Sequence, residues 1–179
     1  MNIIATTLQD CYLLQHTPFD DARGRLLKPF HKSTFTAAGL CDTYGEDLVV
    51  TSAQGVLRGL HFQHAPHAQV KVVTCVHGRI FDAVVDLRSD SPTFRQWQGF
   101  ELWGDGDCSL YVPAGFAHGY YVYEDQTVVF YKCSALYSPE YDGGIRWDSA
   151  GVEWPDASPT VSDKDRMLPD LEAYLSARL

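Results

Sequence analysis

Short runs of β-branched and aromatic residues, separated by Gly, Pro and Asp, dominate the middle of the chain. Such runs favour strands, and their spacing of roughly ten residues is typical of antiparallel sandwiches and barrels. We therefore predict one domain over residues 1–179 that is mainly β, a jelly-roll barrel with short terminal helices. The predicted strands are Val70–Val76, Ile80–Leu87, Gln98–Leu102, Ser109–Val112, Tyr120–Tyr123 and Thr127–Cys133.

Turn and helix signals complete this outline. The dipeptide His77-Gly78 between the first two runs predicts a hairpin. Ser33 is placed to cap a short helix that ends at Gly39. Leucines recur at near-helical spacing in Met167–Leu179, so we expect a helix at the C-terminus.

Composition narrows the class of protein. The chain has 45% hydrophobic and 21% charged residues, which is typical of a globular domain. A net charge of -9 without a cluster of Lys and Arg argues against nucleic-acid binding. The start of the chain lacks the basic region of a signal peptide, and no apolar run approaches the roughly 18 residues of a membrane span. The five cysteines are widely spaced, so we expect reduced thiols and a cytoplasmic location.

The stretch Gly55–Gln63, GVLRGLHFQ, is the densest candidate for chemistry. It places Arg58 and His61 three residues apart, a spacing that puts side chains on opposite faces of a regular strand. Gly59 permits a bend or bulge that would turn both into a barrel mouth. The alternative without a functional role is that Arg58 is a solvated surface residue and His61 a hydrogen-bonded histidine of the core.

Further polar residues follow at intervals. Gln69 and Lys71 should share one face of a strand, and His118 follows a Pro-Gly turn just before the next strand. Tyr131 should point to the face opposite Phe130. The segment Ser162–Asp165 comes after the last strand, where a charged helix start is the simpler interpretation. Together these residue types are those of a general acid/base site for an anionic substrate.

These motifs resemble the dTDP-4-dehydrorhamnose 3,5-epimerase family, in the order in which that family carries them and over nearly the whole chain. The matching segments include Phe19–Gly24 (FDDARG), Gly55–Gln63, Gln69–Lys71 (QVK), Val112–Gly119 (VPAGFAHG), Tyr131-Lys132 and Ser162–Asp165 (SDKD). The resemblance implies a cupin-type jelly roll, a homodimer, no metal or other cofactor, and a nucleotide-diphospho-4-keto-6-deoxy sugar as substrate.

The same resemblance implies roles for individual residues. His61 matches the family's catalytic base, with Asp165 as the carboxylate that orients it, and Tyr131 matches the acid. A ketone acidifies its neighbouring C–H bonds by delocalising negative charge onto its oxygen. The resulting enolate oxygen needs a fixed positive charge nearby, and Lys71 is our leading candidate for supplying it. Tyr131 should return a proton from the face opposite His61, which inversion requires.

Other positions are implied to bind the substrate. Arg58 and His118 match positions around the sugar and its keto oxygen, with Gln69 beside them. Arg23 matches a position near the diphosphate, on a segment that comes from the partner subunit in this family. Tyr137 is a candidate for stacking on the nucleotide base.

The chain departs from the family pattern at the rim of this site. Family members usually carry Gln-x-Asn-x-Ser before the GVLRG motif. The corresponding positions here are Glu46, Leu48 and Val50. Lys28 stands where many members have Glu. The alternative is a local shift of one or two residues that lets Asp47 or Thr51 act in their place.

Three other functions compete with a 3,5-epimerase. The first is an epimerase that inverts one centre or acts on a different nucleotide-4-keto sugar. The second is a metal-dependent cupin with His61, His64, His67 and His118 as ligands, although this sequence lacks the usual close carboxylate. The third is a cupin that binds a sugar nucleotide without catalysis.

Overall fold

The computed structural model describes residues 1–177 of the chain. Its strands are β1 Asn2–Ala5, β2 Tyr12–Gln15, β3 Phe19–Asp21, β4 Gly24–Leu26, β5 Glu46–Ser52, β6 Leu57–Gln63, β7 Lys71–His77, β8 Arg79–Asp86, β9 Trp97–Trp103, β10 Cys108–Val112, β11 Phe116–Val122, β12 Thr127–Cys133 and β13 Asp142–Gly144. Its helices are α1 Lys32–Ala37, α2 Asp163–Arg166 and α3 Leu171–Ser176. None of the helices in residues 1–177 combines the length and apolar character that crossing a membrane demands.

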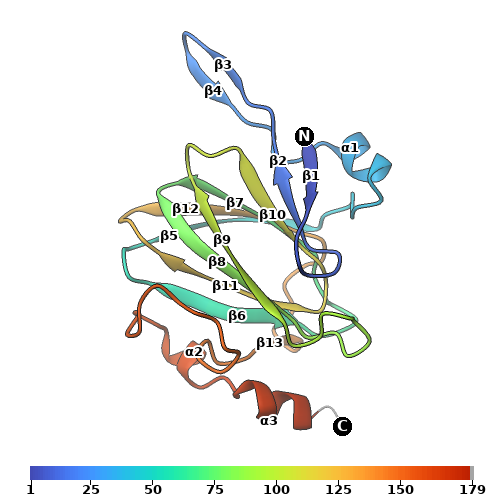
Figure 1. The fold of residues 1–179 in the computed structure, drawn as a ribbon, viewed down its shortest axis with the longest axis vertical. Helices are drawn as coiled ribbons and strands as arrows, with labels where there is room; N and C mark the ends of the chain where they lie inside the picture. The colour runs from blue at the N-terminus through green and yellow to red at the C-terminus, as the bar shows by residue number, and fades with distance from the viewer. Residues whose placement is uncertain (178–179) are drawn as a thin grey trace.

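Two sheets face each other across the main core (Figure 1). The first has the strand order β1-β2-β10-β7-β12-β5, and the second has β13-β6-β11-β8-β9. Both sheets contribute buried apolar residues to one cluster, for example Val73 and Val129 from the first and Val84 and Phe100 from the second. The predicted mainly β fold is confirmed. The described strands do not join the two sheets edge to edge, so the barrel stays open as a sandwich.

The predicted hairpin at His77-Gly78 is wrong. β7 pairs with β10 and β12 in the first sheet, whereas β8 pairs with β11 and β9 in the second. The turn at Gly78, with a φ of 75°, therefore carries the chain from one sheet to the other. Both strands are flanked on both edges, and the local sequence encodes the turn but not those partners.

Three smaller predictions also need correction. β11 begins at Phe116, so His118 lies inside the strand and not before it. Ser33 does not cap α1, because His31 occupies the N-cap and Ser33 lies inside the helix. The C-terminal helix is shorter than predicted. A separate α2 precedes α3, and the last two predicted residues, 178–179, lie outside the described part.

Helices and connecting segments cover the outer faces of the sandwich. On the first sheet, Phe35 of α1 packs with Leu14, Val72 and Tyr111. On the second, Leu171 and Tyr174 of α3 pack with a larger apolar group that includes Leu60, Phe62 and Ile145. This layering covers the central strands on two sides, and β8 and β11 are accordingly buried along most of their length.

The β3–β4 hairpin stands away from the body of the molecule (Figure 1). All six of its strand residues are exposed, and the side chains of Phe19 and Leu26 are 66% and 56% exposed. Phe19 and Leu26 pair across this hairpin and lie outside the three core clusters of the described residues.

A bulge between β6 and β11 shapes the inner face of the second sheet. His118 pairs with His61 and Tyr120 pairs with Arg58, so two residues of β6 face the single Gly119 of β11. Gly59 within this bulge has a φ of 140°. A Cβ added there would lie 2.6 Å from the Cα of Gly119. The bulge therefore requires glycine on conformational and steric grounds together.

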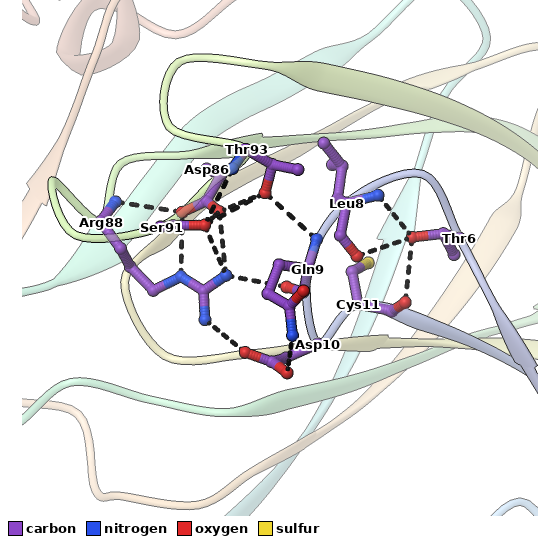
Figure 2. A network of polar contacts seen from close by, with 9 residues as sticks. All are labelled: Thr6, Leu8, Gln9, Asp10, Cys11, Asp86, Arg88, Ser91 and Thr93. Atoms are coloured by element: carbon purple, nitrogen blue, oxygen red, sulfur yellow. Dashed lines mark hydrogen bonds and ion pairs between the residues drawn. The ribbon is translucent and has the colours of Figure 1, made fainter.

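A buried carboxylate ties the N-terminal loop to the loop after β8 (Figure 2). Asp86 is fully buried and accepts hydrogen bonds from the side chains of Arg88, Ser91 and Thr93. The Arg88 guanidinium reaches on to Asp10, with Nη1 2.9 Å from Oδ2. Burial raises the pKa of Asp86, but these hydrogen bonds outweigh it and hold the pKa below its ordinary value.

We expect Gly59→Ala to lower the free energy of unfolding by about 2–5 kcal/mol, since it combines left-handed strain with a backbone collision. Gly55→Ala is a matched control, because Gly55 has a φ of 78° but open space around its Cα. That variant should lose only about 1–2 kcal/mol. Urea denaturation of both variants measures the difference, and equal losses would contradict the close packing of β6 on β11.

We expect Asp86→Asn to lower the free energy of unfolding by about 2–4 kcal/mol, because Arg88 would lose the buried one of its two carboxylate partners and keep only the half-exposed Asp10. A carboxyl with a depressed pKa stabilises the fold above its unfolded pKa of about 4 and loses that contribution as pH falls. The loss in the variant should therefore shrink below about pH 4 in denaturation curves. Asp90→Asn, at an exposed position in the same loop, should change little at any pH.

Candidate active site

A cavity of about 710 Å³ lies between the two sheets, closed at one side by α2 and the segment before it. Its walls come from β5, β6, β7, β11 and β12. Nine of the ten sequence-predicted site residues line it: Glu46, Arg58, His61, Gln69, Lys71, His118, Tyr131, Tyr137 and Asp165. The tenth, Arg23, does not. The fold thus gathers residues that lie up to 119 positions apart in the chain, from Glu46 to Asp165.

His61 and Asp165 form a hydrogen-bonded pair on one wall of the cavity. The His61 Nε2 lies 2.7 Å from the Asp165 Oδ1, and the Asp165 side chain is only 5% exposed. Ser162 caps α2 by accepting a hydrogen bond from the Asp165 amide, which fixes the start of the helix. The second carboxylate oxygen accepts from the Gly59 amide at 3.3 Å. The β6 bulge and α2 therefore hold the carboxylate from two sides.

The ionisation of Asp165 settles which imidazole nitrogen carries the proton. Burial raises the pKa of Asp165, but hydrogen bonds from His61, Gly59 and Ser162 outweigh it and leave the pKa below its ordinary value. An ionised carboxylate only accepts, so the His61 Nε2 is the donor. In the neutral ring the lone pair is then on Nδ1, which gives His61 a free basic nitrogen.

Tyr131 stands on the other sheet, in β12, across the cavity from β6. Its ring lies 5.7 Å from the His118 ring at an interplanar angle of 80°. Burial raises the pKa of Tyr131 well above its ordinary value, so the phenol holds its proton at neutral pH. The cavity thus has a protonated phenol and an oriented imidazole on opposing walls.

Lys71 and Glu46 lie on the first sheet, in strands on either side of β12. Lys71 pairs with Cys133 across β7 and β12, and Cys133 pairs with Glu46 across β12 and β5. Burial lowers the pKa of Lys71, while the nearby Cys133, Asp142 and Asp82 act in the opposite direction. Gln69 donates to the Ala135 carbonyl at 2.8 Å and reaches Glu46 at 3.4 Å.

A second His–Asp pair, which sequence reasoning missed, lies beneath the cavity. The His118 Nε2 is 3.0 and 2.9 Å from the two oxygens of Asp82, and Asp82 is fully buried. Burial raises the pKa of Asp82, although His118 and Lys71 act against that rise. The available signal was the pair of carboxylates, Asp82 and Asp86, inside the apolar run IFDAVVDL, since a buried carboxylate needs a partner.

Two predicted binding residues lie toward the cavity mouth. Arg58 donates from Nε to the Ser52 hydroxyl at 3.0 Å, and its remaining guanidinium donors are available to a ligand. Tyr137 is 55% exposed, and its hydroxyl donates to Asp142 at 3.2 Å. Lys164 also pairs with Asp142. Lys164 and Asp142 are further lining residues that sequence reasoning missed.

The three rim positions that depart from the family pattern face the cavity. Glu46, Leu48 and Val50 alternate along β5 and all line it. Asp47 points to the other face, where Lys132 Nζ lies 2.7 Å from its Oδ1. Thr51, four residues after Asp47 in the same strand, is not among the lining residues. The local shift considered from the sequence therefore does not occur.

Arg23 is the predicted residue that the fold does not bring to the cavity. It lies in the turn of the exposed β3–β4 hairpin, with its side chain 90% exposed and paired with Asp21. Its expected role near the diphosphate, from a partner subunit, stays a prediction.

The histidines required by a metal-dependent cupin do not converge. His61 and His118 line the cavity, whereas His64 packs on the Phe62 ring at 5.1 Å and His67 on the Tyr141 ring at 4.5 Å. Within residues 1–177, no cluster of three or more His, Cys, Asp or Glu side chains is arranged to hold a metal ion.

Comparison with known proteins agrees with the geometry. A family model described as dTDP-4-dehydrorhamnose 3,5-epimerase matches residues 5–173. The dTDP-4-dehydrorhamnose 3,5-epimerase of Shigella flexneri is 40% identical over 168 residues, which are 92% of this chain and 93% of that protein.

Two solved structures show the same fold. The dTDP-4-dehydrorhamnose 3,5-epimerase of Bacillus anthracis, with TDP and PPi bound, is 42% identical with a TM-score of 0.91, and the match covers 95% of this chain and 99% of that one. The dTDP-6-deoxy-D-glucose-3,5-epimerase of Legionella pneumophila, in complex with dTDP-4-keto-L-rhamnose, is 34% identical with a TM-score of 0.91, covering 96% and 93%. This chain belongs to the dTDP-4-dehydrorhamnose 3,5-epimerase family.

Proposed function

We propose that this enzyme inverts C3 and C5 of dTDP-4-dehydro-6-deoxyglucose and yields dTDP-4-dehydrorhamnose. The observation that carries the proposal is the pair of proton-transfer groups on opposite walls of one cavity. His61 with Asp165 lies on the second sheet, and Tyr131 lies on the first. Inversion of a carbon needs removal of a proton from one face and its return to the other, and this arrangement supplies both.

The base step uses the free nitrogen of His61. The 4-keto group acidifies the C–H bonds at C3 and C5, and the imidazole takes one of these protons. Asp165 stabilises the resulting imidazolium, since its ionised carboxylate already accepts from Nε2. General base catalysis of this kind accelerates a reaction by about 100- to 10,000-fold.

The enolate step uses two polar side chains inside the cavity, Lys71 and His118. As the proton leaves, negative charge collects on the keto oxygen, and Lys71 supplies a fixed donor there, assisted by His118. A preorganised donor at a developing oxyanion contributes roughly 3–4 kcal/mol in other enzymes. Asp82 holds His118 through both carboxylate oxygens, so the ring does not reorganise during the reaction.

The nucleotide occupies the open side of the cavity. Arg58, whose outer guanidinium donors are not used by Ser52, binds the sugar beside its keto oxygen. Tyr137 stacks on the base. Arg23 binds the diphosphate from the partner subunit of a homodimer, whose contact includes the exposed apolar residues of the β3–β4 hairpin. The TDP and PPi held by the Bacillus relative support this ligand class.

We infer a cytoplasmic location from the state of the cysteines. All five cysteines are free, and Cys11, Cys75 and Cys133 are buried. Unpaired cysteines are typical of proteins in reducing compartments, where thiols are kept reduced.

Three other assignments have distinct signatures. A mono-epimerase would incorporate solvent deuterium at one carbon only, and an enzyme for another nucleotide would prefer a CDP, GDP or UDP sugar. A binding protein would show no exchange at all. A metal-dependent cupin would contain stoichiometric metal after purification.

We expect His61→Ala to reduce deuterium incorporation at C3 and C5 by about 100- to 10,000-fold, because the base is lost. Tyr131→Phe should retain more exchange but form less inverted product, since His61 can still return a deuteron to the original face. NMR of dTDP-4-keto-6-deoxyglucose incubated in heavy water reads both quantities. His67→Ala, which removes a histidine outside the cavity, serves as control. Equal losses of exchange and inversion in the two site variants would refute the division of roles.

The departures from the family pattern at Glu46, Leu48 and Val50 change how the substrate is bound and leave the reaction itself unchanged. Glu46, Leu48 and Val50 all face the cavity, so the amide and hydroxyl groups usual in the family are absent from its wall. A ligand hydroxyl or carbonyl that meets Leu48 or Val50 loses a hydrogen bond, at roughly 1–3 kcal/mol per group. Such a loss shifts preference among related sugars by about tenfold or more.

We expect the triple variant Glu46→Gln, Leu48→Asn and Val50→Ser to raise kcat/KM for dTDP-4-keto-6-deoxyglucose by about tenfold, because it restores polar partners. Asp47→Asn changes the opposite face of the same strand and should have no effect on kcat/KM. If the unaltered enzyme already inverts C3 and C5 efficiently and the triple variant is no better, the rim departure has no bearing on substrate choice.

A further inference from the structure

Tyr120 has a buried hydroxyl that the mechanism above does not use. It lies on β11 two residues after His118, so the two side chains share the inner face of the strand. The residue is 1% exposed, and within residues 1–177 its hydroxyl oxygen is buried without a hydrogen-bond partner. A buried, unsatisfied hydroxyl is unfavourable, and one in a well-packed core calls for an explanation.

Tyr120 is a neighbour of the proposed acid, Tyr131. Its ring lies 6.3 Å from the Tyr131 ring and 6.5 Å from the His118 ring. Ser52 and Arg58, themselves joined by a 3.0 Å hydrogen bond, are its other polar neighbours. Burial raises the pKa of Tyr120, while Ser52, Arg58 and Tyr131 act to lower it. The hydroxyl is therefore close to these groups but short of hydrogen-bond geometry.

We propose that Tyr120 is a positioning residue whose hydroxyl donates a hydrogen bond to the Tyr131 oxygen when Tyr131 gives up its proton. This inference rests on the proposed role of Tyr131 as the acid. The bond satisfies the Tyr120 hydroxyl at the stage when charge develops on Tyr131.

The charge balance of the step shows why such a donor matters. His61 has taken a proton from the substrate carbon and holds it as imidazolium. The Tyr131 O–H bond then breaks as the new C–H bond forms on the opposite face, and the negative charge of the enolate moves to the phenolic oxygen. Tyr120 keeps its own proton throughout and contributes a hydrogen bond.

The burial of Tyr131 makes the donor necessary. A phenolate in this cavity lacks solvation by water, and a hydrogen bond to a charged oxygen is roughly twice as strong as one between neutral groups. Arg58 adds positive charge from the far side of Ser52. A donor that is unpaired in the resting site and paired only after proton transfer selectively stabilises the later state, which accelerates the step.

The test is Tyr120→Phe, which removes one oxygen atom and leaves the ring in place. We expect inversion of dTDP-4-keto-6-deoxyglucose to slow by about 10- to 100-fold, while deuterium exchange into the substrate and the KM change by less than about twofold. The thermal midpoint should not fall, because the hydroxyl has no partner to lose in the resting protein. Tyr44→Phe is the matched control. It removes a hydroxyl that donates to the Cys41 carbonyl at 2.9 Å, away from the cavity. It should lower stability and leave the ratio of inversion to exchange unchanged.

The outcomes separate this inference from the proposed function. An unchanged ratio of inversion to exchange in Tyr120→Phe, or a parallel fall in both with a lower thermal midpoint, overturns the role of Tyr120. In the same assay, full inversion by Tyr131→Phe would overturn the acid itself. Loss of inversion in Tyr131→Phe with normal behaviour of Tyr120→Phe refutes the positioning role alone.

Discussion

The backbones of β6 and β11 approach each other so closely at Gly59 and Gly119 that neither residue has room for a Cβ. That contact produces the bulge, and the bulge turns Arg58 and His61 toward the same cavity despite their spacing of three. It also aims the Gly59 amide at Asp165, which in turn holds His61. One steric constraint between two strands thus fixes the base, its carboxylate and a cation in a single arrangement.

Burial gives these groups their chemical character. Removing Tyr131 from water raises its pKa and keeps a proton available, whereas burial lowers the pKa of Lys71 and raises that of Asp82. The burial of Lys71 and of Asp82 is partly offset by charged neighbours, and His118 also hydrogen-bonds both oxygens of Asp82. A low-dielectric cavity with opposite charges near one another strengthens every interaction with an enolate. The apolar sandwich is therefore part of the catalytic apparatus as well as its support.

The limits of sequence reasoning follow from what is local and what is not. The strand runs and the bulge at Gly59 are local, so β7, β8 and β12 could be predicted to within about a residue or two. Strand pairing is not local. The Gly78 turn looks like a hairpin, yet it connects two sheets. The short N-terminal strands lack a strong periodic pattern and could not be predicted.

The site shows the same division. Nine of the cavity residues could be identified from the sequence, because the resemblance to a family supplied the long-range relation between its motifs. Asp82 and Tyr120 lie inside largely apolar strands, where the sequence can indicate a buried polar group but not its partner. Their importance is visible only once the fold shows what surrounds them, a partner for Asp82 and a vacant hydrogen bond for Tyr120.

The sheet explains why residues at the cavity rim depart from the family pattern while the proton-transfer residues inside the cavity match it. β5 is the edge strand of its sheet, and Leu48 remains 43% exposed, so its side chains meet solvent and ligand more than core. A substitution there disturbs few packed neighbours. His118 and Tyr131 are packed between the sheets against each other and against Tyr120. A change at either would disturb the core and the chemistry together. Selection for a different sugar or nucleotide can therefore act on the edge strand, while the proton-transfer groups remain fixed by the packing that positions them.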